Sequence, residues 1–224
     1  TLPGGQTETC AYDISGRLVA RTDFNGYATA FEYDAMGRLL AKVPDPRRNE
    51  PSVTFAYDIL GLRTNMTDAS GATRYAYDAR HRLVRKSKTW CGSELPPVPF
   101  GVALDYAYDL NGNLTGIASS DSGGAEAAYE YDALNRLSVV NDPHVGRTEY
   151  AYDEAGNLAG CAYPNGVSSE YRYDALNRLT SLSSVSAQTP VAAYAYTVGP
   201  AGNRLTAGEA VMAGGVTRTV SRLY

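Results

Sequence analysis

Aspartates, histidines and cysteines are the side chains of this sequence whose types could perform chemistry. Eight aspartates recur in the pair Tyr-Asp, and carboxylates held close together can act as general acid and base. The other candidates for metal ligands or nucleophiles are His81, His144, Cys10, Cys91 and Cys161. The histidines lie at predicted turns, and the cysteines have neither Cys-x-x-Cys nor another metal-ligand spacing. Repetition favours a turn-forming role for the aspartates, so the sequence predicts no enzyme and no catalytic, cofactor-binding or metal-binding residue.

The Tyr-Asp pairs mark a repeated unit. Successive tyrosines of these pairs are 20 to 31 residues apart, and self-similarity at such a period is typical of repeat architectures. Four residues after each tyrosine the chain has Gly, His or Asn. These positions define the predicted structural repeat motif, which comprises Tyr12, Asp13, Gly16, Tyr33, Asp34, Gly37, Tyr57, Asp58, Gly61, Tyr77, Asp78, His81, Tyr108, Asp109, Gly112, Tyr131, Asp132, Asn135, Tyr152, Asp153, Gly156, Tyr173, Asp174 and Asn177.

The residue types four positions after each tyrosine predict a left-handed backbone. Gly lacks a Cβ, and Asn and His are enriched at positive φ. The aspartate then begins a type I turn, in which its carboxylate accepts a backbone N–H from two residues further on. The left-handed residue closes a bulge in a hairpin. By this reasoning, Asn is expected to replace Gly37 at little cost in stability.

Strands are predicted on both sides of each turn. Aromatic residues alternate before the turn, as in Phe31-x-Tyr33, and aromatic residues favour strands. The intervening residue is Ala or a charged residue, so one sheet face is aromatic and the other is small or solvated. A second strand begins at a leucine after the turn, as at Leu39, and ends at a second turn such as residues 23–26. One unit is therefore strand, turn, strand, turn, and the fold class is all-β, built from tandem antiparallel hairpins.

The repeats extend over the whole chain, which we predict to be a single array over residues 1–224. A ninth unit is degenerate, with Val198-Gly199 in place of Tyr-Asp. Residues 86–105 are expected to form an irregular insertion, because the spacing widens there and three prolines occur close together. Two interpretations of this stretch remain: a tolerated hairpin extension, and a docking loop that uses Trp90. The chain begins in a turn without an initiator Met and ends before another unit, so we expect a segment of a longer protein.

Composition limits the partners. The net charge of −4 and the pI of about 5.2 argue against nucleic acid or an anionic membrane surface, because either would need a basic stripe. No run of 18 apolar residues exists, so this segment is not expected to insert into a membrane. Three cysteines specify no disulfide framework; reduced or unpaired thiols are expected, and one incidental pair remains an alternative. The end strands are expected to associate edge to edge, since unpaired strand edges pair readily.

Units such as Tyr33-Asp34-Ala35-Met36-Gly37-Arg38-Leu39 and residues 173–179 resemble the RHS repeat, also called the YD repeat, over essentially the whole chain. Members of this family include bacterial polymorphic toxins, shell-forming components of insecticidal toxin complexes and animal teneurins. The resemblance implies a curved single-layer sheet that is one wall segment of a hollow β-shell, or cocoon. Self-cleaving members carry an Asp-Pro-x-Gly-Leu type motif. Asp45-Pro46 and Asp142-Pro143 depart from that motif, so no protease residue is assigned.

Two classes of function follow from the resemblance and the aromatic repeats. The first is a structural module that encapsulates a C-terminal toxin domain until delivery. Its partners would be the remaining repeats of the parent chain and the enclosed toxin, in a secreted or cell-surface protein of bacterial source. The second is an extracellular adhesion or glycan-binding module that uses aromatic platforms. A variable cytotoxic domain after the array would favour the first, and a membrane anchor with adhesive domains would favour the second.

Overall fold

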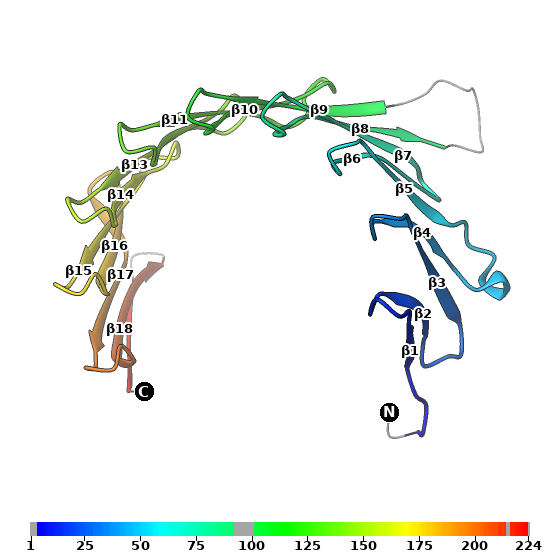
Figure 1. Cartoon of the computed structure of the whole chain (residues 1–224). Helices are drawn as coiled ribbons and strands as arrows, with labels where there is room; N and C mark the ends of the chain where they lie inside the picture. Colours follow the sequence, from blue (N-terminus) through cyan, green and yellow to red (C-terminus); the bar gives the residue numbers. More distant parts are fainter. Residues whose placement is uncertain (1–3, 92–100, 214–215, 224) are drawn as a thin grey trace. The chain divides into compact units, whose positions relative to one another are not determined.

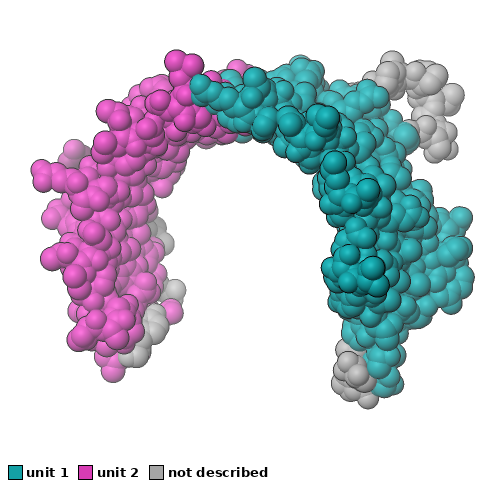
Figure 2. Space-filling model, in the orientation of Figure 1, with its two compact units in different colours: residues 1–107, 117–125 teal, residues 108–116, 126–224 magenta. Residues whose placement is uncertain are grey.

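The computed structural model describes residues 4–91, 101–213 and 216–223. Within these residues it contains β-strands and one short 3-10 turn, η1 (Pro46–Arg48), and no α-helix. The chain divides into unit 1, residues 1–107 and 117–125, and unit 2, residues 108–116 and 126–224 (Figure 2). The predicted all-β chain of tandem antiparallel hairpins is confirmed.

Each strand of unit 1 pairs antiparallel with the strands that precede and follow it. The hairpins therefore lie in sequence order. All Tyr-Asp turns of the unit lie at the same ends of the hairpins, along one side of the sheet. The strands are β1 (Thr9–Tyr12), β2 (Leu18–Thr22), β3 (Ala28–Tyr33), β4 (Leu39–Val43), β5 (Val53–Tyr57), β6 (Arg63–Asp68), β7 (Gly71–Tyr77), β8 (Leu83–Trp90) and β9 (Gly101–Tyr108), whose last residue falls in unit 2.

Unit 2 repeats this arrangement with its own antiparallel neighbours. Figure 1 shows the strands of each unit following one another, and the described residues place no second layer of secondary structure against either face. Strand β10 (Leu114–Ser119) has residues in both units, and the remaining strands are β11 (Glu126–Tyr131), β12 (Leu137–Asp142), β13 (Gly146–Tyr152), β14 (Leu158–Ala162), β15 (Val167–Tyr173), β16 (Leu179–Ser186), β17 (Thr189–Val198), β18 (Arg204–Ala213) and β19 (Val216–Leu223).

The two faces of each sheet differ as the alternating sequence predicts. In β3, Phe31 and Tyr33 are half-buried whereas Ala30 and Glu32 are exposed. The same alternation occurs in β13, where Tyr150 and Tyr152 are half-buried. We call the face that carries these rings the aromatic face. Side chains of adjacent strands meet across it, so cross-strand pairs contribute to the cohesion of the sheet.

Very little of the sheet is buried in either unit. Among the side chains that the structure describes, the buried apolar ones are Ala41, Ala103, Val139 and Cys161, and none is a large side chain below 2% exposure. A single layer has no opposing layer to cover it, so a sandwich-type core does not form. Strand pairing and side-chain contacts between hairpins must therefore hold the structure together.

Parts of the predicted insertion at residues 86–105 are regular strand. Residues of β8 pair with β9 from Arg85 opposite Asp105 to Thr89 opposite Gly101. Trp90 is the last residue of β8, opposite Gly71, and is 43% exposed. The additional length of this repeat is thus taken up in part by longer strands, because extended residues on both sides can continue the ladder. The three prolines lie outside the described residues.

Candidate functional site

The repeated turn is the local structure that the Tyr-Asp motif builds. In the second repeat, the Gly37 amide donates to the Asp34 carbonyl and the Asp34 amide donates to the Arg38 carbonyl, both at 2.9 Å. Gly37 has φ of +80°, where an ordinary side chain would be strained. All eight motif positions predicted to be left-handed have φ between 58° and 98°, so the predicted backbone is observed. A further register shift at Tyr33, where two residues of β4 face one of β3, was not predicted.

The aspartate carboxylate fixes this turn from inside. Asp34 Oδ1 accepts hydrogen bonds from the amides of Met36 at 2.9 Å and Arg38 at 2.8 Å. Its Oδ2 accepts from Arg38 Nε at 2.6 Å. The backbone N–H of Arg38, together with its guanidinium, lowers the pKa of Asp34 below its usual value. The same contacts recur at Asp132 and Asp174. A carboxylate whose two oxygens are engaged in this way acts as a turn anchor rather than as a base.

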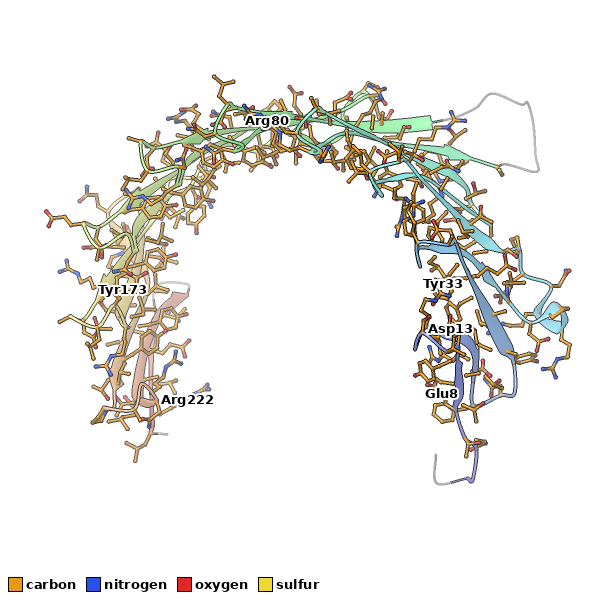
Figure 3. The ribbon with its side chains drawn as sticks, in the orientation of Figure 1. Glu8, Asp13, Tyr33, Arg80, Tyr173 and Arg222 are labelled. Atoms are coloured by element: carbon orange, nitrogen blue, oxygen red, sulfur yellow. The ribbon has the colours of Figure 1, made fainter. Side chains whose placement is uncertain are left out.

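A hydrogen bond joins each of these hairpins to the one before it. Tyr57 Oη donates to the Leu39 carbonyl at 2.9 Å, and the Arg38 guanidinium lies 5.0 Å from the centre of the Tyr57 ring. Arg38 also donates to the Asp58 carbonyl at 2.9 Å. Because one tyrosine contacts the strand and the arginine of the preceding hairpin, the motif works between repeats as well as within them. Figure 3 labels Asp13 and Tyr33, which belong to two consecutive hairpins of unit 1.

We call this contact the Tyr–Leu link, after its hydroxyl donor and its usual backbone acceptor, which is replaced by the Arg63 carbonyl in one repeat. Burial raises the pKa of Tyr77, Tyr131 and Tyr173 above its usual value. The links run from Tyr33 to Leu18, Tyr57 to Leu39, Tyr77 to Arg63, Tyr131 to Leu114, Tyr152 to Leu137 and Tyr173 to Leu158, at 2.8 to 3.0 Å.

Asparagine takes the place of arginine in two repeats. Asn157 Nδ2 donates to Asp153 Oδ2 at 3.0 Å, where an arginine would place its Nε. The same group donates to Oδ1 of Asn177 in the next hairpin at 2.9 Å. The turn anchor is therefore kept in these repeats, but the contact to the next hairpin is an amide–amide hydrogen bond.

A second anchor lies around η1, which connects β4 to β5 at the strand ends opposite the Tyr-Asp turns. Asp45 is 8% exposed and accepts hydrogen bonds from the amides of Ala28 and Arg47 and from the Arg47 guanidinium. Arg47 and Arg48 both lie over the Tyr27 ring, at 4.9 and 5.4 Å from its centre. These contacts hold the pKa of Asp45 well below its usual range, chiefly through the guanidinium of Arg47. The sequence contained only the Asp-Pro pair as a signal, which does not reveal a partner 17 residues away.

The remaining chemical candidates are not brought together. His81 occupies its left-handed turn position with φ of 62°, and His144 is exposed. Cys10 and Cys91 are exposed and Cys161 is buried, all as free thiols. Within the ranges that the structure describes, no three His, Cys, Asp or Glu side chains are grouped to hold a metal ion. No described helix has the length and apolar character to cross a membrane.

Comparison with known families and proteins gives consistent matches. The family model described as Teneurin YD-shell matches residues 4–148 and 47–198. The double-stranded DNA deaminase toxin A of Burkholderia cenocepacia is 30% identical over an alignment of 171 positions that covers 70% of this chain and 11% of that protein. The probable deoxyribonuclease RhsB of Dickeya dadantii is 28% identical over an alignment of 191 positions that covers 71% of this chain and 13% of that protein. This chain thus spans about a tenth of the length of these relatives.

Solved structures show a similar fold. The crystal structure of TcdB2-TccC3-TEV matches with a TM-score of 0.71 and 16% identity over 90% of this chain and 11% of that one. The crystal structure of TcdB2-TccC3-Cdc42 matches with a TM-score of 0.72 and 17% identity, over 92% and 12% of the respective chains. At this level of identity, the comparison supports the fold.

Proposed function

This chain belongs to the teneurin YD-shell family, and from that premise we propose that it is a structural shell module that encloses a C-terminal toxin domain and protects it until delivery. The observation that carries the proposal is the use of the motif side chains. The aspartates, arginines and tyrosines are engaged in holding one hairpin to the next, as at Asp34, Arg38 and Tyr57. A wall built in this way gains stability from each added hairpin rather than from a core.

The relatives support a division of labour. Their names describe a deaminase toxin and a deoxyribonuclease, and each is about eight to nine times as long as the matched region. We assign those activities to other parts of such proteins. The present chain is then not an enzyme by itself, and its partners are further repeats and the enclosed domain. In this proposal residues 1–224 form one array within an exported bacterial protein.

Protease protection in a full-length protein that contains this array tests the proposal. The Gly37→Val, Gly112→Val and Gly156→Val changes together should break three left-handed turns, since a β-branched residue is disfavoured at positive φ. The C-terminal domain should resist added protease in the unaltered protein and be cut rapidly in the triple variant, while its isolated activity stays the same. Equal protection in both proteins would contradict enclosure.

An adhesion or glycan-binding module is the second candidate, favoured by the row of half-buried rings on the aromatic face. Tyr150 and Tyr171, for example, lie on that face in neighbouring hairpins. Binding of the 224-residue chain to immobilised glycans distinguishes the two candidates. Tight, saturable binding to one glycan that is lost in a Tyr150→Ala variant would favour adhesion over enclosure.

A further inference from the structure

Two positions in consecutive repeats vary together along this chain. The first is the residue that follows the left-handed position of one repeat, and the second is the left-handed residue of the next repeat. We call them a junction pair. Where the first position of a junction pair is Arg, the second is Gly, and where the first is Asn, the second is Asn. The remaining junction pair is Leu62 and His81. The Arg–Gly pairs are Arg17–Gly37, Arg38–Gly61, Arg82–Gly112, Arg136–Gly156 and Arg178–Gly202, and the Asn–Asn pairs are Asn113–Asn135 and Asn157–Asn177.

In three of the Arg–Gly pairs the arginine guanidinium lies against the glycine. A Cβ added to Gly37, Gly61 or Gly156 would be in van der Waals contact with the arginine Nη1, at 3.5, 3.8 and 3.7 Å, whereas a Cβ added to Gly202 would have no atom within 4 Å. The guanidinium is held there because it lies over the tyrosine ring of the next hairpin, at 4.4 Å for Arg136 over Tyr152. A longer side chain at the glycine would have to displace the arginine from the ring or turn away from the junction.

The Asn–Asn pairs have a polar cause. Asn113 Nδ2 donates to Asn135 Oδ1 at 2.8 Å, and Asn157 Nδ2 donates to Asn177 Oδ1 at 2.9 Å. Asparagine is short enough to leave room for the second side chain, whose Oδ1 accepts the hydrogen bond from the first; Asn135 Oδ1 also accepts one from Asn111 Nδ2 at 2.9 Å. With Gly in the second position this hydrogen bond would be lost.

We propose that the junction pair selects which hairpin can stack on which. A hairpin with Arg at this position accepts a neighbour whose left-handed residue is Gly, and a hairpin with Asn accepts a neighbour whose left-handed residue is Asn. The partner is thus another hairpin of the same repeat type, of a specified kind. A hairpin that pairs with β1 should carry Arg, because the left-handed residue of the first repeat is Gly16. This selection operates whatever the array encloses, so it does not depend on the proposed function.

The proposal changes one expectation drawn from the sequence. Gly and Asn both tolerate positive φ, so the turn alone predicts that they are interchangeable at residue 37. The presence of Arg17 across the junction makes them unequal. Gly16 provides the matched control, since no described hairpin precedes it and a Gly16→Asn change tests the turn without a junction.

Double-mutant cycles in the 224-residue chain test the selection. One cycle combines Asn157→Arg with Asn177→Gly, and the other combines Arg136→Asn with Gly156→Asn. Hydrogen exchange of the turn amides, such as that of Asp174, reports local opening of each hairpin. Each single variant mismatches its junction, and each double variant restores an allowed pair. The intrinsic cost of a residue at positive φ cancels in the cycle.

The expected result is non-additivity of the same sign in both cycles. The turn amides of each double variant should exchange at least about threefold more slowly than predicted by adding the free-energy changes of the two single variants. This difference lies within the usual range for contacting residues. Gly16→Asn should change exchange less than Gly156→Asn does. Additive effects in the two cycles, or equal effects of Gly16→Asn and Gly156→Asn, would overturn the proposal. If one variant fails to fold, the other cycle decides.

Discussion

Removing one tyrosine hydroxyl should loosen the junction at which that tyrosine acts. Tyr152 Oη donates to the Leu137 carbonyl at 2.8 Å, and the Arg136 guanidinium lies 4.4 Å from the ring centre. Tyr152→Phe deletes the hydrogen bond and keeps the ring beneath the guanidinium. A net hydrogen bond contributes about 0.5–1.5 kcal/mol, and the half-buried site places this one near ~1 kcal/mol. Tyr152→Leu also removes the cation–π contact, which adds about 0.5–1 kcal/mol.

Native-state hydrogen exchange measures this effect locally. A loss of ~1 kcal/mol should speed the exchange of the turn amides near Asp153 about fivefold, and Tyr152→Leu should speed it more. Tyr12→Phe is the matched control, because Tyr12 has the same place in the first repeat and is 61% exposed with no described hairpin before it. Equal effects of Tyr12→Phe and Tyr152→Phe would refute the Tyr–Leu link as a contact that holds hairpins together.

Three further outcomes follow from the turns and the thiols. In the folded state the pKa of Asp34 is lowered and that of Asp68 is about 2. The stability that these carboxylates contribute is therefore present above the unfolded pKa of about 4 and is lost as the pH falls from there toward 2. A melting temperature that does not change across this pH range would contradict this. Gly37→Val should lower the free energy of unfolding by more than ~1 kcal/mol, as measured in urea, since φ is +80° there; an unchanged midpoint would refute this. In a thiol-reagent titration of the native chain, Cys161 should react far more slowly than Cys10; equal rates would mean that β14 opens readily.

Local sequence patterns predict the hairpins because their causes are local. The type I turn at Asp34–Gly37 depends on an aspartate and a residue that tolerates positive φ, and both are visible in the sequence. The strands follow from alternating rings such as Phe31 and Tyr33. Around Trp90, the nearby prolines concealed strands that continue the ladder, because a proline run signals irregular backbone without indicating where it begins.

The contacts between hairpins were harder to predict. The acceptor of the Tyr57 hydroxyl is a backbone carbonyl, and every residue has one, so no residue type marks it. The partners of Asp45 are similarly hidden, since Ala28 offers only its amide. The difference between Gly and Asn at the left-handed position depends on a residue one repeat earlier. The motif of a single repeat therefore predicts its turn but does not specify these backbone partners.

The position of the C-terminal domain relative to the repeat sheet is the most direct test of the proposed function. Cryo-electron microscopy of a full-length protein that contains this array would measure it. Enclosure predicts that the sheet to which this array contributes surrounds density for that domain, folded or not. In the Gly37→Val, Gly112→Val and Gly156→Val triple variant, the sheet should no longer surround that density. A C-terminal domain that stands outside the sheet and is open to solvent in the unaltered protein would contradict the account.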